Sequence, residues 1–68
     1  MILVLKKDDI LYYSYEIWEK TYIFEKESLK LYEMDEDENS LDKFDIIDYI
    51  NDYDLEYKLK DIAYENYK

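Results

Sequence analysis

The chain has 68 residues and contains neither Cys nor His, so no disulfide bond or structural zinc site can hold it together. A domain of this size lies near the lower limit at which a hydrophobic core alone confers stability. Apolar residues make up 49% of the sequence and aromatic residues 19%, which is more than a disordered acidic chain carries. We therefore expect residues 1–68 to form a single compact domain, with homodimer formation as a further source of stability.

Apolar runs in the first half of the chain predict strands. Residues 1–6 are almost wholly apolar and are typical of a buried strand. Residues 10–18 are rich in Tyr and Ile, which favours a strand, although their apolar positions would also fit one face of a helix. Residues 21–27 and 28–34 are also expected to be strands, joined by a turn that lacks the Gly or Asn of a typical tight hairpin.

The second half of the chain predicts two helices. In the first, the apolar side chains fall within about 160° of arc at 100° per residue, and they are Phe44, Ile46, Ile47 and Ile50. Asn39 or Ser40 would cap this helix, and Asp54 would cap the second.

The apolar face of the second helix consists of Leu55, Leu59, Ile62 and Ala63. Its pairs Asp54–Lys58 and Glu56–Lys60 have the i,i+4 spacing of favourable ion pairs. Because residues 51–54 contain no Pro or Gly, one continuous helix is the alternative. The expected fold is α+β, a small antiparallel sheet of two to four strands followed by two C-terminal helices.

Acidic residues are concentrated between Asp35 and Glu56. This segment holds ten acids and one lysine, a net charge of −9, whereas the whole chain carries −10. On the first predicted helix, Asp42, Asp45, Asp48 and Asp52 would share one face with Tyr49, opposite the apolar face. The ordinary interpretation is a solvated face, and the alternative is a binding surface. Such charge on so small a protein also predicts that added salt stabilises it.

Several classes of function are disfavoured. Without His, the usual base of nucleophilic catalysis is missing, so we expect no enzyme activity. Without Gly or Arg there is no phosphate-cradling loop and no bidentate phosphate contact, so we expect no cofactor and no direct binding of nucleic acid. The apolar opening is too short for a signal peptide or membrane span, which predicts a cytoplasmic protein with no membrane partner.

The acidic segment also contains the beginning of a metal-binding pattern. Asp35, Asp37 and Asn39 have the alternate spacing that opens an EF-hand calcium loop. Ser40 then stands where the loop needs Gly, and Ile46 stands where it needs a bidentate Glu. We therefore expect at most a weak, nonspecific divalent site and no dedicated metal centre.

With its small size, its charge and the acids clustered in "MDEDENSLDKFDIIDYINDYDLE" (residues 34–56), the chain resembles the small acidic inhibitors that phages and mobile elements make against host nucleic-acid enzymes. These include anti-CRISPR proteins, anti-restriction proteins and uracil-DNA glycosylase inhibitors, several of which mimic DNA. The resemblance implies a stoichiometric inhibitor that covers the nucleic-acid site of a CRISPR effector, a restriction enzyme or a repair enzyme in a bacterial host cell.

In this interpretation eight carboxylates act as phosphate surrogates: Asp35, Glu36, Asp37, Glu38, Asp42, Asp45, Asp48 and Asp52. Tyr49 and Tyr53 would serve as stacking anchors, because tyrosine offers a large rigid contact surface at low entropic cost. The alternative is an immunity protein or antitoxin that neutralises a basic toxin through the same surface.

Overall fold

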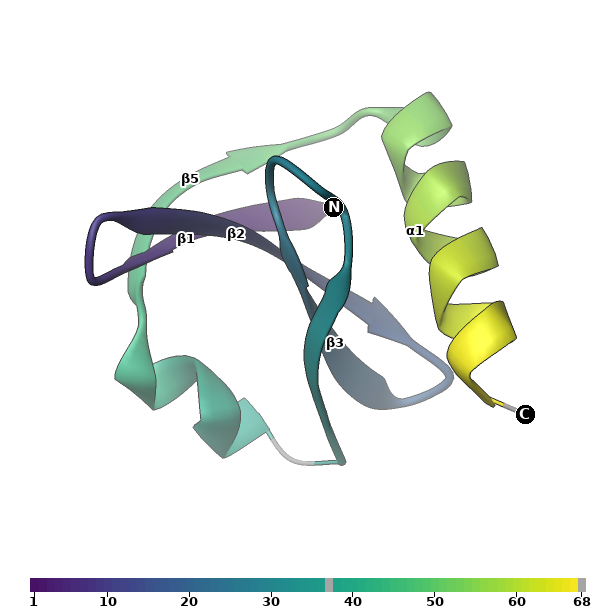
Figure 1. Cartoon of the computed structure of the whole chain (residues 1–68), viewed down its shortest axis with the longest axis horizontal. Coiled ribbons are helices and arrows are strands. Elements are labelled where there is room, and N and C mark those ends of the chain that lie inside the picture. The colour runs from purple at the N-terminus through teal and green to yellow at the C-terminus, as the bar shows by residue number, and fades with distance from the viewer. Residues whose placement is uncertain (37, 68) are drawn as a thin grey trace.

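The computed structural model describes residues 1–36 and 38–67, which form one antiparallel sheet, a short 3₁₀-helix and a C-terminal α-helix (Figure 1). The strands are β1 (Ile2–Lys7), β2 (Ile10–Ile17), β3 (Lys20–Glu25), β4 (Leu31–Asp35) and β5 (Asp45–Ile50). The 3₁₀-helix η1 (Glu38–Lys43) precedes β5, and α1 (Tyr53–Tyr67) follows it. The strand order β4-β3-β2-β1-β5 shows that the first four strands meander and that the chain then returns to place β5 beside β1.

The predicted strands of the first half are confirmed as β1 to β4, but the expected fold is wrong in the second half. The sheet of the described residues has five strands, and a single α-helix follows it. The predicted first helix is instead β5, which pairs antiparallel with β1 from Ile2 opposite Ile50 to Lys6 opposite Asp45. The alternative of one continuous helix is wrong for the same reason.

A physical reason for β5 lies in β1. Ile2, Leu3, Val4 and Leu5 are apolar side chains that alternate between the two faces of the sheet, so β1 is a central strand and needs hydrogen-bonding partners on both sides. The consecutive β-branched residues Ile46 and Ile47 suit a pleated strand. Pairing with β1 therefore overrides the helical period of the apolar residues in this segment.

Both two-residue hairpin turns form without glycine. Asp8 and Asp9 have φ of 52° and 66° between β1 and β2, and Trp18 and Glu19 have φ of 53° and 63° between β2 and β3. Positive φ at both central residues is the signature of a type I′ turn, which suits the twist of the flanking strands. A β-carbon makes this conformation costly, so the chain accepts local strain at four positions where glycine would relieve it.

The sheet carries a core on each face. Successive residues of a strand point to opposite faces, so Ile23 faces one side while Tyr22 and Phe24 face the other. On the side of Ile23, η1 and the residue after it supply Leu41 and Phe44 to a small cluster with Leu5 and Tyr12. On the other side, α1 packs against a larger cluster, whose buried strand residues are Ile2, Tyr15, Ile17, Tyr22 and Phe24.

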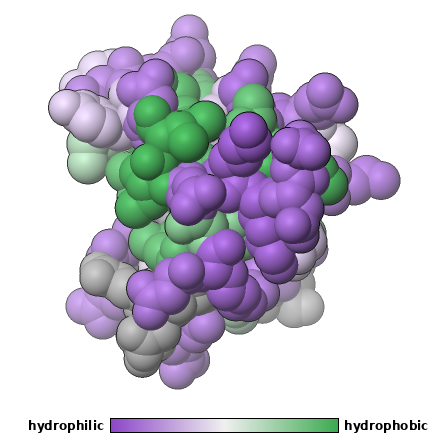
Figure 2. Space-filling model, turned by 90° about the vertical axis from the view of Figure 1, so that its left-hand side faces the viewer, coloured by the Kyte–Doolittle hydropathy of each residue, from purple (hydrophilic) through white to green (hydrophobic). Residues whose placement is uncertain are grey.

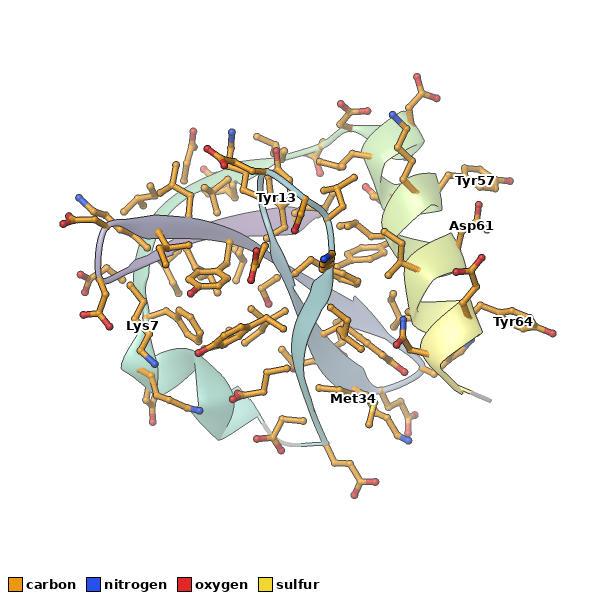
Figure 3. The ribbon with its side chains drawn as sticks, viewed as in Figure 1. Lys7, Tyr13, Met34, Tyr57, Asp61 and Tyr64 are labelled. Carbon is orange, nitrogen blue, oxygen red and sulfur yellow. The ribbon has the colours of Figure 1, made fainter. Side chains whose placement is uncertain are left out.

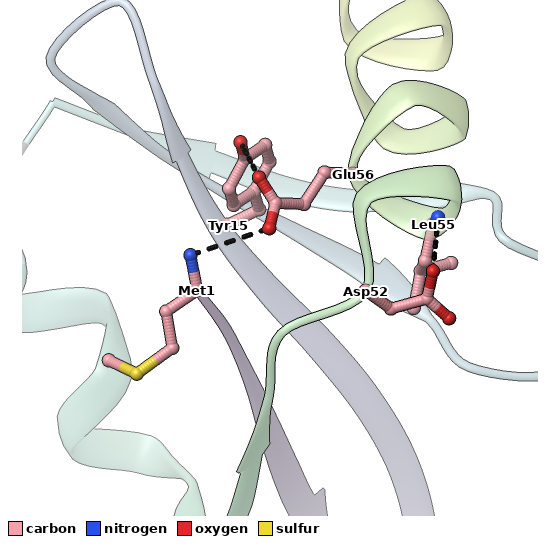
Figure 4. Close-up of polar contacts among 5 residues, drawn as sticks. All are labelled: Met1, Tyr15, Asp52, Leu55 and Glu56. Carbon is pink, nitrogen blue, oxygen red and sulfur yellow. Dashed lines mark hydrogen bonds and ion pairs between the residues drawn. The ribbon is translucent and has the colours of Figure 1, made fainter.

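Helix α1 packs through the face that its sequence predicts. Leu59 and Ala63 are fully buried, and Leu55 and Ile62 are partly buried against the same cluster. The predicted N-cap, however, is wrong: Oδ1 of Asp52, rather than Asp54, accepts a 3.2 Å hydrogen bond from the backbone N–H of Leu55 (Figure 4). No helix in the described part of the chain has the length and apolar character required to cross a bilayer.

The first turn of α1 is also tied to the sheet by Glu56. The carboxylate accepts a hydrogen bond from the hydroxyl of Tyr15 and lies 3.6 Å from the amino group of Met1 (Figure 4). Glu56 therefore points toward the sheet rather than along the helix to Lys60, where the sequence spacing placed its partner.

Candidate binding surface

The predicted acidic residues do not lie on one helix. Asp35 ends β4, and Glu36 follows it with an ion pair to Lys20 at 3.9 Å. Asp42 lies in η1, and Asp52 caps α1. Asp37 and the side chain of Glu38 lie outside the described residues. The expectation of a single acidic helix face is therefore wrong, and the acids are distributed over four successive parts of the fold.

Two of these acids nevertheless share a face, because β5 contains a bulge. Asp48 is opposite Val4 while Ile46 is opposite Leu5, so Ile47 is an extra residue in the ladder. Asp45 is opposite Lys6, and cross-strand partners point to the same side of a sheet. Asp45 and Asp48 thus lie on the face of Val4 and Lys6, although residues three apart in a regular strand point to opposite faces. Because the bulge makes three steps along β5 match the two steps from Val4 to Lys6, Asp45 and Asp48 lie roughly 7 Å apart along the strand, compared with about 4.5 Å of rise on a helix.

The predicted aromatic anchors are exposed, but Tyr49 does not share the face of Asp45 and Asp48 as expected. Tyr53, in the first turn of α1, is 80% exposed, and Tyr49 on β5 is 64% exposed. Tyr49 is opposite Leu3, which places it on the face opposite that of Asp48. Its backbone N–H donates a 2.8 Å hydrogen bond to Oδ1 of Asp48.

Strand β5 also exposes two isoleucines that sequence reasoning placed in a buried helix face. Ile46 and Ile47 are each more than half exposed, and β5 lies at the edge of the sheet. Figure 2 views the molecule from the side of the β1–β2 turn and shows a hydrophobic patch bordered by hydrophilic side chains. The signal that could have identified them is the β-branched pair itself, because it favours a strand over a helix.

The described carboxylates of β5 and η1 are not paired with the neighbouring lysines. Lys43, the single lysine between Asp35 and Glu56, donates a 2.8 Å hydrogen bond to Oε1 of Glu33 on β4, and this bond raises the pKa of Lys43. Lys6, opposite Asp45 in the ladder, has its ammonium group 4.0 Å from Asp9 instead.

Three exposed acids of η1 and β5 form no ion pair with a lysine in the part of the chain that the structure describes: Asp42, Asp45 and Asp48. We call these three carboxylates, together with the exposed side chains of Ile46, Ile47 and Tyr49, the acidic edge. It combines uncompensated negative charge with apolar contact area.

The described residues offer little to a small ligand. No group of three or more of their Asp or Glu side chains is placed to hold a metal ion. Two of the three positions that resemble a calcium loop, Asp37 and the side chain of Asn39, lie outside the described residues. A hollow of ≈ 250 Å³ between the β1–β2 and β3–β4 connections is open to solvent and lined mainly by charged residues. Small-molecule sites are usually enclosed and mostly apolar. Neither this hollow nor the exposed acidic edge has that form, so the acidic edge is better suited to contact with a macromolecule.

Comparison of the chain with models of known protein families, with curated proteins and with solved structures finds no match.

Proposed function

We propose that the protein is a stoichiometric inhibitor whose acidic edge binds the basic nucleic-acid site of another protein and excludes the nucleic acid. The observation that carries the proposal is the uncompensated negative charge of this edge. Asp42, Asp45 and Asp48 are exposed and form no ion pair within the described residues, while Lys43, next to Asp42, and Lys6, opposite Asp45, contact other acids.

The geometry of Asp45 and Asp48 supports a role as phosphate surrogates. Their separation of roughly 7 Å along the strand equals the axial rise of about two nucleotides of one DNA strand. Solvated carboxylates attract a basic partner over a distance and accelerate its association, with a strong dependence on salt. Ile46, Ile47 and Tyr49 then supply apolar and aromatic contact area, which slows dissociation of the complex once it has formed.

The target class follows from the charge. A protein that fits this edge needs a cationic groove that a duplex or heteroduplex normally fills. CRISPR effectors hold their heteroduplex in such a channel and are the first class to test. Restriction enzymes and repair enzymes are the next classes to test. In each case the inhibitor would bind the enzyme and would not bind the nucleic acid.

The test is a displacement assay. A fluorescently labelled duplex is bound to a purified CRISPR effector, a restriction endonuclease or a repair glycosylase, and release of the duplex is followed as the protein is added. We expect release at a one-to-one ratio with at least one of the three enzyme classes, weakening as NaCl is raised. We also expect no change in the duplex signal when the enzyme is omitted.

Two matched variants make the assay specific. Replacing Asp42, Asp45 and Asp48 with Lys should abolish release. Replacing three exposed acids elsewhere with Lys changes the net charge equally and should leave release intact; these are Glu16, Glu19 and Glu27. Equal loss in both triple variants would reduce the effect to net charge. Full release by the first variant would disprove the role of the acidic edge.

A further inference from the structure

The sheet face that η1 covers is left open at one end. At its closed end the ring of Phe44 packs against Leu5 and Tyr12, and Nζ of Lys7 lies 5.7 Å from the centre of that ring. Figure 3 shows Lys7 beside η1. At the other end is a second hollow, of ≈ 240 Å³, distinct from the one lined mainly by charged residues. Its lining residues are Met1, Leu3, Ser14, Glu16, Thr21 and Leu41.

Strand pairing places four of these residues on one face. Leu3 is opposite Ser14, and Glu16 is opposite Thr21. Ser14 and Glu16 are two residues apart on β2, so their side chains point to the same side. Thr21 is also opposite Asp35 on β4. The side chain of Thr21 therefore lies between two carboxylates in one row across the sheet.

Two buried hydroxyl groups face this hollow without a partner. Ser14 is 4% exposed and Thr21 is 6% exposed, and both line the hollow. Neither hydroxyl forms a hydrogen bond within the described part of the chain. Buried polar side chains of proteins nearly always have a hydrogen-bond partner. A ligand in the hollow would supply one to each hydroxyl, which the hollow between the turn connections does not offer.

The charges around the second hollow favour a cation. Glu16 is exposed at its rim and forms no ion pair in the described structure. Lys43 reaches over the same face but bonds Glu33, and the amino group of Met1 lies 3.6 Å from Glu56. The net charge of −10 also repels anions and attracts cations.

The size of the hollow limits the ligand to a small ion. Pockets for drug-sized ligands have volumes of about 300–1,000 Å³, which exceed this one. Leu3 and Leu41 offer apolar contact to a short alkyl chain. A guanidinium group carries five N–H donors in one plane and is more weakly hydrated than an ammonium group. We propose that the hollow binds an alkylguanidinium ion, which donates hydrogen bonds to the hydroxyls of Ser14 and Thr21 and to the carboxylate of Glu16.

This site is independent of the proposed inhibitory function. The control variant in which Glu16, Glu19 and Glu27 become Lys should still release duplex from the target enzyme. The same variant should lose the guanidinium ion, because it replaces the carboxylate at the rim with a positive charge. Failure of one proposal therefore leaves the other standing.

The experiment is a titration of ¹⁵N-labelled protein with n-butylguanidinium chloride at constant ionic strength, followed by two-dimensional NMR. We expect saturable shifts of the backbone amide signals of Leu3, Ser14 and Thr21. The dissociation constant should be on the order of 1 mM, as suits so small a ligand. The neutral analogue n-butylurea should bind about tenfold more weakly or less, because its hydrogen bonds to Glu16 lack the charge of the cation.

Matched variants test the assigned groups. Thr21→Val keeps the shape of the side chain but removes the hydroxyl, and should weaken binding about tenfold, whereas Thr21→Ser should restore most of the affinity. Glu16→Gln removes the rim charge and should weaken binding by a similar factor. Glu27→Gln makes the same charge change in the exposed β3–β4 connection and should leave binding unchanged.

Circular dichroism melting curves establish that each variant is folded. Shifts that grow linearly with concentration at acidic residues throughout the chain would mean that the cation only joins the diffuse ion atmosphere, and would overturn the proposal. Equal binding of n-butylurea would also overturn it, as would a Thr21→Val variant that binds as tightly as the wild type.

Discussion

The hydroxyl of Tyr15 on β2 donates a 2.7 Å hydrogen bond to Oε1 of Glu56 in the first turn of α1. This bond is the main reason that the pKa of Tyr15 is raised from its ordinary value to about 12, and burial of the ring adds to the effect. The pair joins residues 41 positions apart in the sequence. It therefore attaches the helix to the sheet by a polar contact beside the apolar packing of Leu59.

Tyr15→Phe should lower the free energy of unfolding by about 1–2 kcal/mol at neutral pH, because the carboxylate of Glu56 loses a donor at a partly buried position. The folded pKa of Tyr15 lies above its unfolded value of 10, so its contribution is complete below pH 10 and is lost as pH rises through about 12. Denaturant unfolding at several pH values measures this. Between pH 10 and 12 the wild type should lose stability faster than the variant, and parallel curves would contradict the assignment.

Asp52→Ala should destabilise the protein by about 1 kcal/mol, because the N–H of Leu55 loses its cap. Asp54→Ala provides the matched control, since Asp54 is exposed in the first turn without a capping bond in the described structure and should cost less. Asp52→Asn retains a capping oxygen and should restore most of the loss. Thermal melts of the three variants test the order, and a larger effect at Asp54 would assign the cap to that residue instead.

Glu19→Gly should stabilise the protein by about 1 kcal/mol, because Glu19 has φ of 63° and glycine adopts this conformation without a β-carbon clash. Glu16→Gly makes the same chemical change inside β2 and should destabilise instead, because glycine weakens a strand interior. Urea midpoints compare the two variants directly. Destabilisation by both would mean that the turn is not strained.

The melting temperature should rise with NaCl, because salt screens the mutual repulsion of a chain with a net charge of −10. Replacing Asp42, Asp45 and Asp48 with Lys brings the net charge to −4, so the rise should become smaller. Differential scanning calorimetry over a series of NaCl concentrations measures both slopes. A wild-type melting temperature that falls with moderate salt would contradict the prediction.

The sequence pattern predicts secondary structure correctly where the residues of a segment themselves determine it. Apolar and β-branched runs locate β1 to β4, and the positions of Leu55, Leu59, Ile62 and Ala63 define the buried face of α1. The segment that became β5 could not be predicted in this way. Its apolar residues have a helical period, and only the need of β1 for a second neighbour makes it a strand. That need is a property of the whole sheet and cannot be read from residues 45–50 alone.

The sequence predicts the exposure of the acids of the candidate site but neither its geometry nor the exposure of Ile46 and Ile47. Exposure of Asp42, Asp45 and Asp48 was expected, and the structure places all three at the surface. Asp45 and Asp48 share a face because of the bulge at Ile47, which depends on the register with β1. The same register turns Tyr49 to the opposite face. A strand bulge leaves no clear signal in a single sequence, because it is fixed by pairing rather than by composition.

The hydrogen bond from the N–H of Tyr49 to Asp48 has a consequence for solubility. Edge strands with exposed apolar residues are templates on which other chains add strands and grow into fibrils. Here the carboxylate of Asp48 covers a donor of its own strand, and its charge discourages a neighbour from approaching next to Ile47. Asp48 thus acts as a gatekeeper against polymerisation, independently of any target that the edge binds.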